Sequence, residues 1–333
     1  SIENFVQFCL ISGNWAEGIW INGPQQPGDV GFNHIFNNYI GTDITGTAAI
    51  QNDHEGVDIS EGAHDNDVVR NLISGNGWDG VGIQGYSNEQ YPAPPIYSHH
   101  NHIIENTIGL DVTGGSLGNG YHGVAIGEYG PPRPQQSQWG FAPDNDVSDN
   151  TIAYNGGDGV AVWEDSYDNA NADGNLITKN RIYDNIGLGI DLQNDGVTLN
   201  DVGDLDARAN QELNFPIIDS AIYSGGTTTI YGKLSIDVSP TTATVEVFQA
   251  DVDPTGYGEG AVYIDSTVPI NAAGDWSLTT TALVTGDSVT ATATDQNSNT
   301  SEFSATIEVT GEQPPLWDCE ENPPDNKTGG GWE

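Results

Sequence analysis

Residues 33–40 read Asn33-His34-Ile35-Phe36-Asn37-Asn38-Tyr39-Ile40, and residues 66–73 repeat them as Asn66-Asp67-Val68-Val69-Arg70-Asn71-Leu72-Ile73. The shared pattern, Asn-x-(Val/Ile)-x-x-Asn-x-Ile, returns at residues 101–108, 145–152 and 175–182. A second pattern, Gly followed by alternating apolar residues, occupies residues 18–21, 56–59, 80–83, 123–126, 159–162 and 189–192. Apolar residues two positions apart predict short strands. A repeat of this size predicts stacked units that bury one continuous core only together.

One coil per repeat places equivalent residues above one another, about 4.8 Å apart. We therefore expect a column of Asn side chains whose amides hydrogen-bond from coil to coil, as in cross-β stacks. Its members are Asn38, Asn71, Asn106, Asn150 and Asn180. The interior beside this column is expected to hold Ile40, Ile73, Ile108, Ile152 and Ile182.

Together the two patterns resemble those of the secreted right-handed parallel β-helix repeat family, the fold shared by pectate lyases. The resemblance covers residues 1–192 and implies an all-β fold, a right-handed parallel β-helix of about five to six coils. It leaves the function open, because this fold hosts lyases, hydrolases, adhesins and inert stalks.

Residues 214–311 change character, with Thr-rich alternating runs separated by turn residues. The runs lie at residues 227–236, 244–248, 261–266, 276–280, 288–294 and 304–309. About seven short strands in roughly 100 residues predict an Ig-like β-sandwich, and residues 295–303 resemble a loop of secreted bacterial Ig-like modules. The predicted domains are the β-helix at 1–192, a linker at 193–213, the sandwich at 214–311 and an extended acidic tail at 312–333.

The charge of the chain excludes several partners. Its 333 residues include 7 Lys and Arg against 48 Asp and Glu, a formal net charge of -41. We therefore expect no binding to nucleic acid or to an anionic membrane surface. No apolar run approaches about 20 residues, so we also expect no membrane insertion. The Gly-rich, Lys-poor composition favours an extracellular or cell-surface protein, and the sequons at Asn299 and Asn326 are compatible with glycosylation.

Two long aromatic loops follow equivalent strands of successive coils and should form one lobe. Residues 84–98 and 127–143 contribute Tyr86, Tyr91, Tyr97, Tyr129, Trp139 and Phe141. The outward residues of the strands beneath are small, namely Gly82, Ala125 and Ala161. One interpretation is a groove in which sugars stack on aromatic rings. The other is a loop cluster that packs on itself, and the sequence leaves both open.

The predicted linker is dense in oxygen ligands. Carboxylates and amides gather at Asn194, Asp195, Asn200, Asp201, Asp204 and Asp206. Hard oxygen ligands at this density suit Ca²⁺, which is the cofactor we expect, although the spacing is not that of an EF-hand. The alternative is a solvated, acid-rich connection without a metal ion.

The sequence assigns no catalytic residue. Successive coils place His34, Asp67, His102 and Asp146 in one outward column. Such a column can bind a transition metal or relay protons, but a surface ladder of His–Asp hydrogen bonds is the favoured interpretation. A lyase of the pectate lyase type would need a basic residue beside Ca²⁺. The candidates Arg70 and Lys179 align instead with acidic residues of adjacent coils, and polygalacturonase signatures are absent.

The two cysteines lie at opposite ends of the sequence, Cys9 in the first predicted coil and Cys319 in the tail. The first coil starts at residue 4 without a cap, which leaves a β-edge open to strand addition. We expect head-to-tail self-association, with a disulfide between neighbouring chains in an oxidising setting. The alternatives are a disulfide within one chain or two free thiols.

These observations favour a secreted structural or adhesive protein of a cell surface or matrix, stabilised by calcium. The second hypothesis is a glycan-binding protein or a glycan-degrading enzyme of the β-helix type, either a polysaccharide lyase or a glycoside hydrolase. A measured product from a polysaccharide panel would decide for an enzyme.

Overall fold

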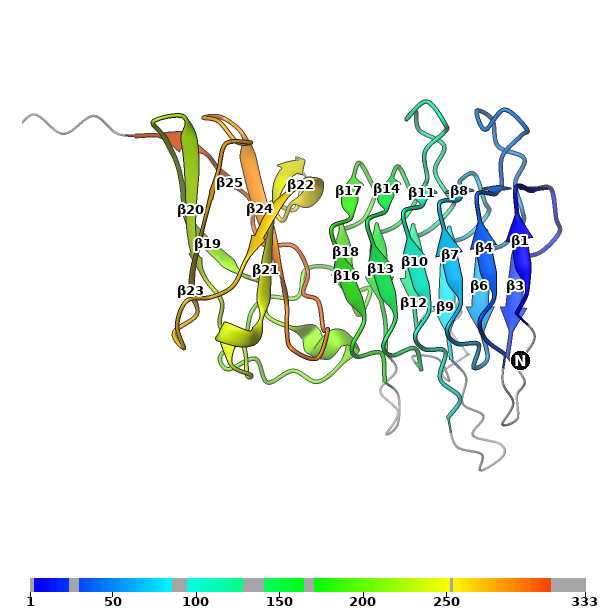
Figure 1. The fold of residues 1–333 in the computed structure, drawn as a ribbon, viewed down its shortest axis with the longest axis horizontal. Coiled ribbons are helices and arrows are strands. Elements are labelled where there is room, and N and C mark those ends of the chain that lie inside the picture. The colour runs from blue at the N-terminus through cyan, green and yellow to red at the C-terminus, as the bar shows by residue number, and fades with distance from the viewer. Residues whose placement is uncertain are drawn as a thin grey trace, which may run out of the picture.

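The computed structural model describes residues 3–23, 30–85, 95–127, 141–164, 171–251 and 254–312. It confirms the predicted all-β fold: three parallel six-stranded sheets form a β-helix of six coils (Figure 1). Sheet A contains β1 (Phe5–Gln7), β4 (His34–Phe36), β7 (Asp67–Val69), β10 (His102–Ile104), β13 (Asp146–Ser148) and β16 (Leu176–Thr178). Sheet B contains β2 (Leu10–Ile11), β5 (Tyr39–Ile40), β8 (Leu72–Ile73), β11 (Thr107–Ile108), β14 (Thr151–Ala153) and β17 (Arg181–Tyr183). Sheet C contains β3 (Ile19–Asn22), β6 (Val57–Ser60), β9 (Val81–Gln84), β12 (Val124–Ile126), β15 (Val160–Val162) and β18 (Ile190–Leu192).

The predicted Asn column is present between sheets A and B. Each side-chain amide donates to the carbonyl oxygen of the Asn one coil further on, at 2.9 Å for Asn38 and 3.0 Å for Asn71, Asn106 and Asn150. The residue before each of these Asn has a left-handed backbone, such as Arg70 with φ 57° and Glu105 with φ 56°. The buried amides satisfy backbone groups at the bend, such as the Asn71 N–H, and so allow non-Gly residues to adopt this conformation.

Two further Asn ladders, neither of which was predicted from the sequence, run along the other two corners. The first ladder joins Asn4, Asn33, Asn66, Asn101, Asn145 and Asn175. The second joins Asn14, Asn52, Asn76, Asn119, Asn155 and Asn185. Each bend of the β-helix is therefore held by stacked amides, and the predicted Ile column lies inside them without solvent exposure.

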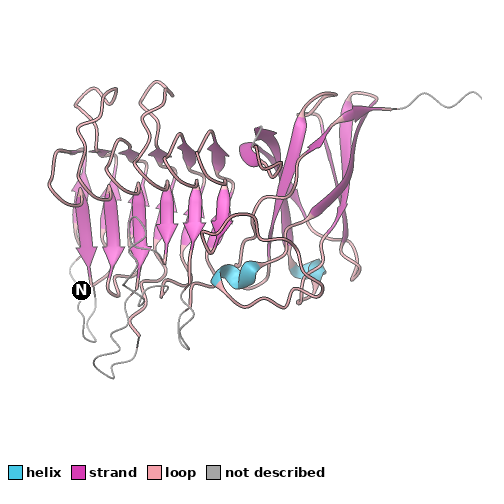
Figure 2. Ribbon diagram, turned by 180° about the vertical axis from the view of Figure 1, so that it is seen from behind, coloured by secondary structure: helices cyan, strands magenta, loops and turns pink. Residues whose placement is uncertain are grey.

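Residues 217–311 form a β-sandwich with its own core, which is centred on Trp276 and Ile230. Sheet D contains β23 (Asp275–Thr280), β20 (Thr227–Lys233), β19 (Ile217–Ser224) and β26 (Thr310–Gly311). Sheet E contains β22 (Glu259–Thr267), β21 (Thr244–Asp251), β24 (Ser288–Thr294) and β25 (Ile307–Glu308). Strand β19 was not among the predicted runs. Two short 3-10 helices, η1 (Ala209–Glu212) and η2 (Pro240–Thr242), complete the elements (Figure 2). Neither they nor any other helix among the described residues is long and apolar enough to cross a bilayer.

The sandwich lies against the last coil, at the end opposite β1 (Figure 1). Its acidic side chains accept the backbone N–H groups that a further coil would have paired. Glu302 Oε1 accepts from Leu192 N at 3.0 Å, and Glu246 Oε2 accepts from Lys179 N at 3.0 Å. The ring of Phe303 joins the β-helix core. The sandwich therefore caps the β-helix.

Asn299, one of the two predicted glycosylation sites, is part of this junction. Its side chain has no exposed surface, and its Oδ1 accepts from Gly174 N at 2.7 Å. A buried, hydrogen-bonded amide cannot carry a glycan in the folded protein, so this prediction is wrong for Asn299. Asn326 lies outside the described residues.

Candidate functional site

Sheet B carries a column of outward side chains that crosses five coils. Strand pairing aligns Tyr39, Leu72, Thr107, Thr151 and Arg181. They occupy the variable position of the first pattern, between its second Asn and its Ile. Since side chains alternate along a strand and the neighbouring Ile face the core, these residues point outward.

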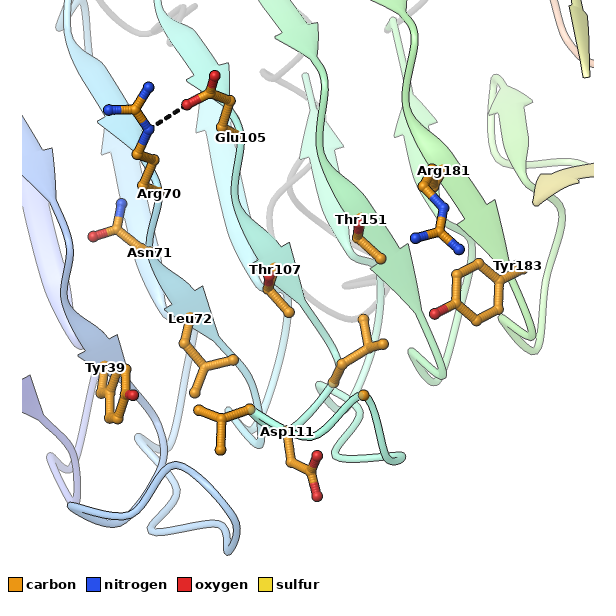
Figure 3. A pocket seen from close by; sticks show the side chains of 13 residues that line it. Tyr39, Arg70, Asn71, Leu72, Glu105, Thr107, Asp111, Thr151, Arg181 and Tyr183 are labelled. Atoms are coloured by element: carbon orange, nitrogen blue, oxygen red, sulfur yellow. Dashed lines mark hydrogen bonds and ion pairs between the residues drawn. The ribbon is translucent and has the colours of Figure 1, made fainter. Parts of the chain in front are cut away.

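A groove with a cavity volume of about 430 Å³ lies over this column. One wall is the turn at residues 110–114, which is joined to the equivalent turn two coils earlier by a 3.1 Å hydrogen bond from Val112 N to Gly46 O. Tyr39 and Tyr183 lie at opposite ends (Figure 3). Four inter-strand steps separate β5 from β17, so the groove is roughly 19 Å long. It offers an aromatic side chain at each end and hydroxyl groups between them.

Two of the few cations of the chain line the groove. Arg70 pairs with Glu105 of the next coil, as the repeat register predicts (Figure 3). Arg181 donates from Nε to the Ala261 carbonyl of the sandwich at 3.2 Å, and its guanidinium carbon lies 5.7 Å from the Tyr183 ring centroid. Within the described part of the chain, no carboxylate lies at ion-pair distance from Arg181. Arg181 is thus a cation held in place by the sandwich and available to an anionic group.

The carboxyl groups of the groove are not arranged as proton donors. Asp111 accepts hydrogen bonds from the Thr113 hydroxyl at 2.7 Å and from Gly115 N at 2.8 Å. These bonds, led by that from Thr113, lower the pKa of Asp111 below its ordinary value. Glu105 is engaged by Arg70. Glycoside hydrolysis needs one carboxyl that keeps its proton, and the lowered pKa of Asp111 disfavours Asp111 in that role.

The predicted aromatic lobe is described only in part. Tyr86, Tyr91, Tyr129 and Trp139 lie outside the described residues. Phe141 is 1% exposed and packs edge-on against Tyr97, with ring centroids 5.7 Å apart. Ala125 and Ala161, expected as an open floor, have no exposed surface. The described residues of the lobe therefore pack against one another over a covered floor. Glycan binding by the lobe stays a prediction.

The acid-rich linker uses its side chains to hold backbone. Asp204 accepts from Asn214 N at 2.8 Å and Asp237 N at 3.2 Å, while Asp201 accepts from Leu205 N at 3.2 Å. Asn200 exchanges two hydrogen bonds with Phe215. The remaining predicted ligands are Asn194 near His122, Asp195, whose N–H donates to Asp191, and the exposed Asp206. These contacts account for Asn200, Asp201 and Asp204 without an ion, and calcium binding in the loop stays a prediction.

The His and Asp column of sheet A forms a hydrogen-bonded ladder. His34 Nδ1 lies 2.8 Å from one oxygen of Asp67, and His102 Nδ1 lies 2.9 Å from the other. Asp146 pairs with His102 in strand register, but its Oδ1 is buried without a hydrogen-bond partner. The hydrogen-bonded ladder is therefore present for His34, Asp67 and His102, and stays a prediction for Asp146. Cys9 is exposed on the first coil, whereas Cys319 lies outside the described residues.

The groove on sheet B was missed because its column mixes residue types. The signal was present: the residue that follows the second Asn of each pattern always faces outward on sheet B. In successive coils this position holds Tyr39, Leu72, two Thr residues and Arg181. The wall could not have been read from the pattern, because turn residues 110–114 lie outside the repeat.

No protein-family model matches the chain. Among solved structures, the enzymatically active domain of tailspike protein 2 of bacteriophage CBA120 shares 10% identity at a TM-score of 0.21, over 86% of this chain and 57% of that one. Full-length tailspike protein 2 from an Escherichia coli O157:H7 bacteriophage shares 9% identity at a TM-score of 0.21, over 93% and 57%. The chain thus spans 57% of the length of either structure. We conclude nothing about function from likenesses of this size.

Proposed function

We propose that the protein is a rigid glycan-binding module that holds an extended oligosaccharide in the groove on sheet B. The observation that carries this proposal is the continuous column from Tyr39 to Arg181, overlain by an open groove of about 430 Å³. Sugars offer apolar faces that stack on aromatic rings and hydroxyl groups that hydrogen-bond to polar side chains. The groove presents both kinds of partner along one line.

Arg181 gives the groove a charge preference. An Arg guanidinium binds a carboxylate through parallel hydrogen bonds, and Arg181 has no acidic partner among the described residues. A net charge of -41 opposes a dense polyanion. The best-matched ligand is therefore an oligosaccharide with a carboxylate on only some of its sugars.

Binding without cleavage fits the groove best. Asp111 has a lowered pKa, so it is poorly suited to donate a proton to a leaving group. Glu105 is paired with Arg70. The stacked coils supply a rigid support, which agrees with the structural or adhesive role and the extracellular location predicted from the sequence. Calcium stabilisation and head-to-tail association stay predictions.

A glycan array tests the proposal. We expect retention of a sparsely carboxylated oligosaccharide, and Tyr183→Ala should weaken its binding about two- to tenfold, because one aromatic contact is lost. Tyr231→Ala provides the control, since Tyr231 is 48% exposed on the sandwich and outside the groove. Arg181→Gln should weaken carboxylated ligands more than neutral ones. Retention of no glycan by the wild type, or equal losses from Tyr183→Ala and Tyr231→Ala, would refute the proposal.

A further inference from the structure

The first two coils bring three metal-ligand side chains together at the bend before sheet C. Glu17 and Glu55 each precede the Gly of the second pattern, one coil apart, and His54 precedes Glu55. The backbone bond from Gly18 N to Glu55 O, 2.9 Å long, joins the two coils at this point. One donor atom of each of the three side chains lies within 4.8 Å of the other two.

The cluster is preorganised and reachable from solvent. His54 Nδ1 lies 2.9 Å from Glu17 Oε1, and the imidazole stacks on Trp78 with ring centroids 4.0 Å apart. The side chains of Glu17 and His54 are 11% and 30% exposed, whereas Glu55 is 1% exposed. An ion can therefore enter beside His54 and reach Glu55 beneath it.

Glu55 supplies an independent sign of a missing partner. Its Oε2 is buried and accepts no hydrogen bond, an arrangement that is costly for a carboxylate. Both carboxylate oxygens of Asp58 already accept a hydrogen bond, Oδ2 from the Ser60 hydroxyl and Oδ1 from the Gln84 amide. Among the three described side chains of the cluster, Glu55 is the one that keeps a buried oxygen without a hydrogen-bond partner.

We propose that Glu17, His54 and Glu55 bind one divalent transition-metal ion, for which Zn²⁺ is the best match. Imidazole nitrogen and carboxylate oxygen are zinc ligands at about 2.0–2.2 Å, which places the donor atoms around one tetrahedral ion roughly 3.3–3.6 Å apart. The 2.9 Å pair of His54 and Glu17 and the 4.8 Å limit on all three donor atoms lie on either side of this range. The imidazole disfavours Ca²⁺, which takes oxygen ligands. The ion would join the first two coils and neutralise Glu55.

Calorimetric titration of the metal-free chain with ZnCl₂, and separately with CaCl₂, tests this site. We expect one Zn²⁺ per chain, a higher melting temperature with Zn²⁺, and no matching response to Ca²⁺. Glu55→Gln and His54→Gln should each weaken Zn²⁺ binding roughly tenfold or more. His34→Gln is the matched control, because it removes an imidazole that is paired with a different carboxylate, Asp67 on sheet A, and should leave the affinity unchanged.

Circular dichroism in EDTA separates loss of the ion from loss of the fold. The His54→Gln variant should disturb packing least, because the His54 side chain is 30% exposed. Co²⁺ gives a second readout, because ligation by His54 would produce visible absorption bands that His54→Gln abolishes. No Zn²⁺ binding, Zn²⁺ binding that survives both substitutions, or an equal loss from His34→Gln would overturn the proposal.

Discussion

Asparagine is the residue that makes this β-helix possible, because one side chain meets several needs of a bend at once. Asn106 Nδ2 donates to Val68 O at 2.7 Å and to Asn150 Oδ1 at 3.0 Å. Its Oδ1 accepts the N–H and the amide of Asn71, at 2.9 and 3.0 Å. Backbone groups at a buried bend would otherwise have no partner. Asn is the shorter of the two amide side chains, and unlike a Ser or Thr hydroxyl it donates and accepts through separate atoms.

Asn106→Ala is therefore expected to destabilise the protein by at least about 2 kcal/mol, since it leaves buried groups of Asn71 and Val68 unpaired. Asn14→Ala at the exposed end of another ladder should cost clearly less. Urea denaturation of both variants measures the difference. Equal effects would mean that the ladders contribute nothing beyond local hydrogen bonds.

The sequence predicted one of the three Asn ladders, the one between sheets A and B. The other corners carried equally regular signals: an Asn opens each copy of the first pattern, and an Asn stands four residues before each Gly of the second. These signals were hidden because loops of unequal length separate the two patterns. The groove column was missed for a different reason: outward positions are free to vary and carry no repeat.

Among the elements, sheet C depends on glycine where its strands begin. A Cβ added to Gly123 would lie 2.6 Å from Gly159 O and 2.3 Å from a methyl carbon of Ile152. The pattern Gly of the neighbouring coils have the same close approach, as at Gly80, where Gly123 O would lie 2.6 Å away. This contact, rather than a positive φ, explains why the second pattern always opens on Gly.

Gly123→Ala should destabilise the chain by about 2–3 kcal/mol, because backbone on one side and packed Ile on the other leave no room for a methyl group. Gly311→Ala on the edge strand β26 is the control, since its nearest neighbour would be 3.7 Å away. Thermal melting of both variants provides the comparison. A Gly123→Ala protein as stable as Gly311→Ala would show that the coils can shift apart freely.

In the whole molecule, the sandwich lies where a seventh coil would follow. Its carboxylates accept the hydrogen bonds that the backbone of such a coil would have accepted. Glu302 accepts from Leu192 N and Thr198 N, and Glu259 continues an Asn ladder by accepting from Asn185. The sequence predicted both domains but not this cap. The cap consists of contacts between residues more than 60 positions apart in the sequence, such as Glu246 with Lys179. Such contacts form only in the folded protein, so no local sequence pattern predicts them.

The cap predicts a pH dependence of stability. Burial raises the pKa of Glu302 from 4.5 to about 8, and that of Asp191 from 3.8 to about 7. A carboxyl with a raised folded-state pKa contributes stability that is complete below its unfolded pKa and is lost as the pH rises through the folded value. The unfolded chain loses these protons near pH 4 and the folded protein only near pH 7 to 8, so the melting temperature should fall between about pH 4 and pH 8 at constant ionic strength. Glu302→Gln should flatten this fall, and an unchanged or rising melting temperature in the wild type would contradict it.

The glycan groove is the central claim, and a crystal structure with an oligosaccharide retained on the array tests it most directly. The sugars are expected along β5, β8, β11, β14 and β17, with rings against Tyr39 and Tyr183 and a carboxylate on Arg181. Sugars bound instead at the loops that carry Tyr91 and Trp139, or on the sandwich alone, would contradict the claim.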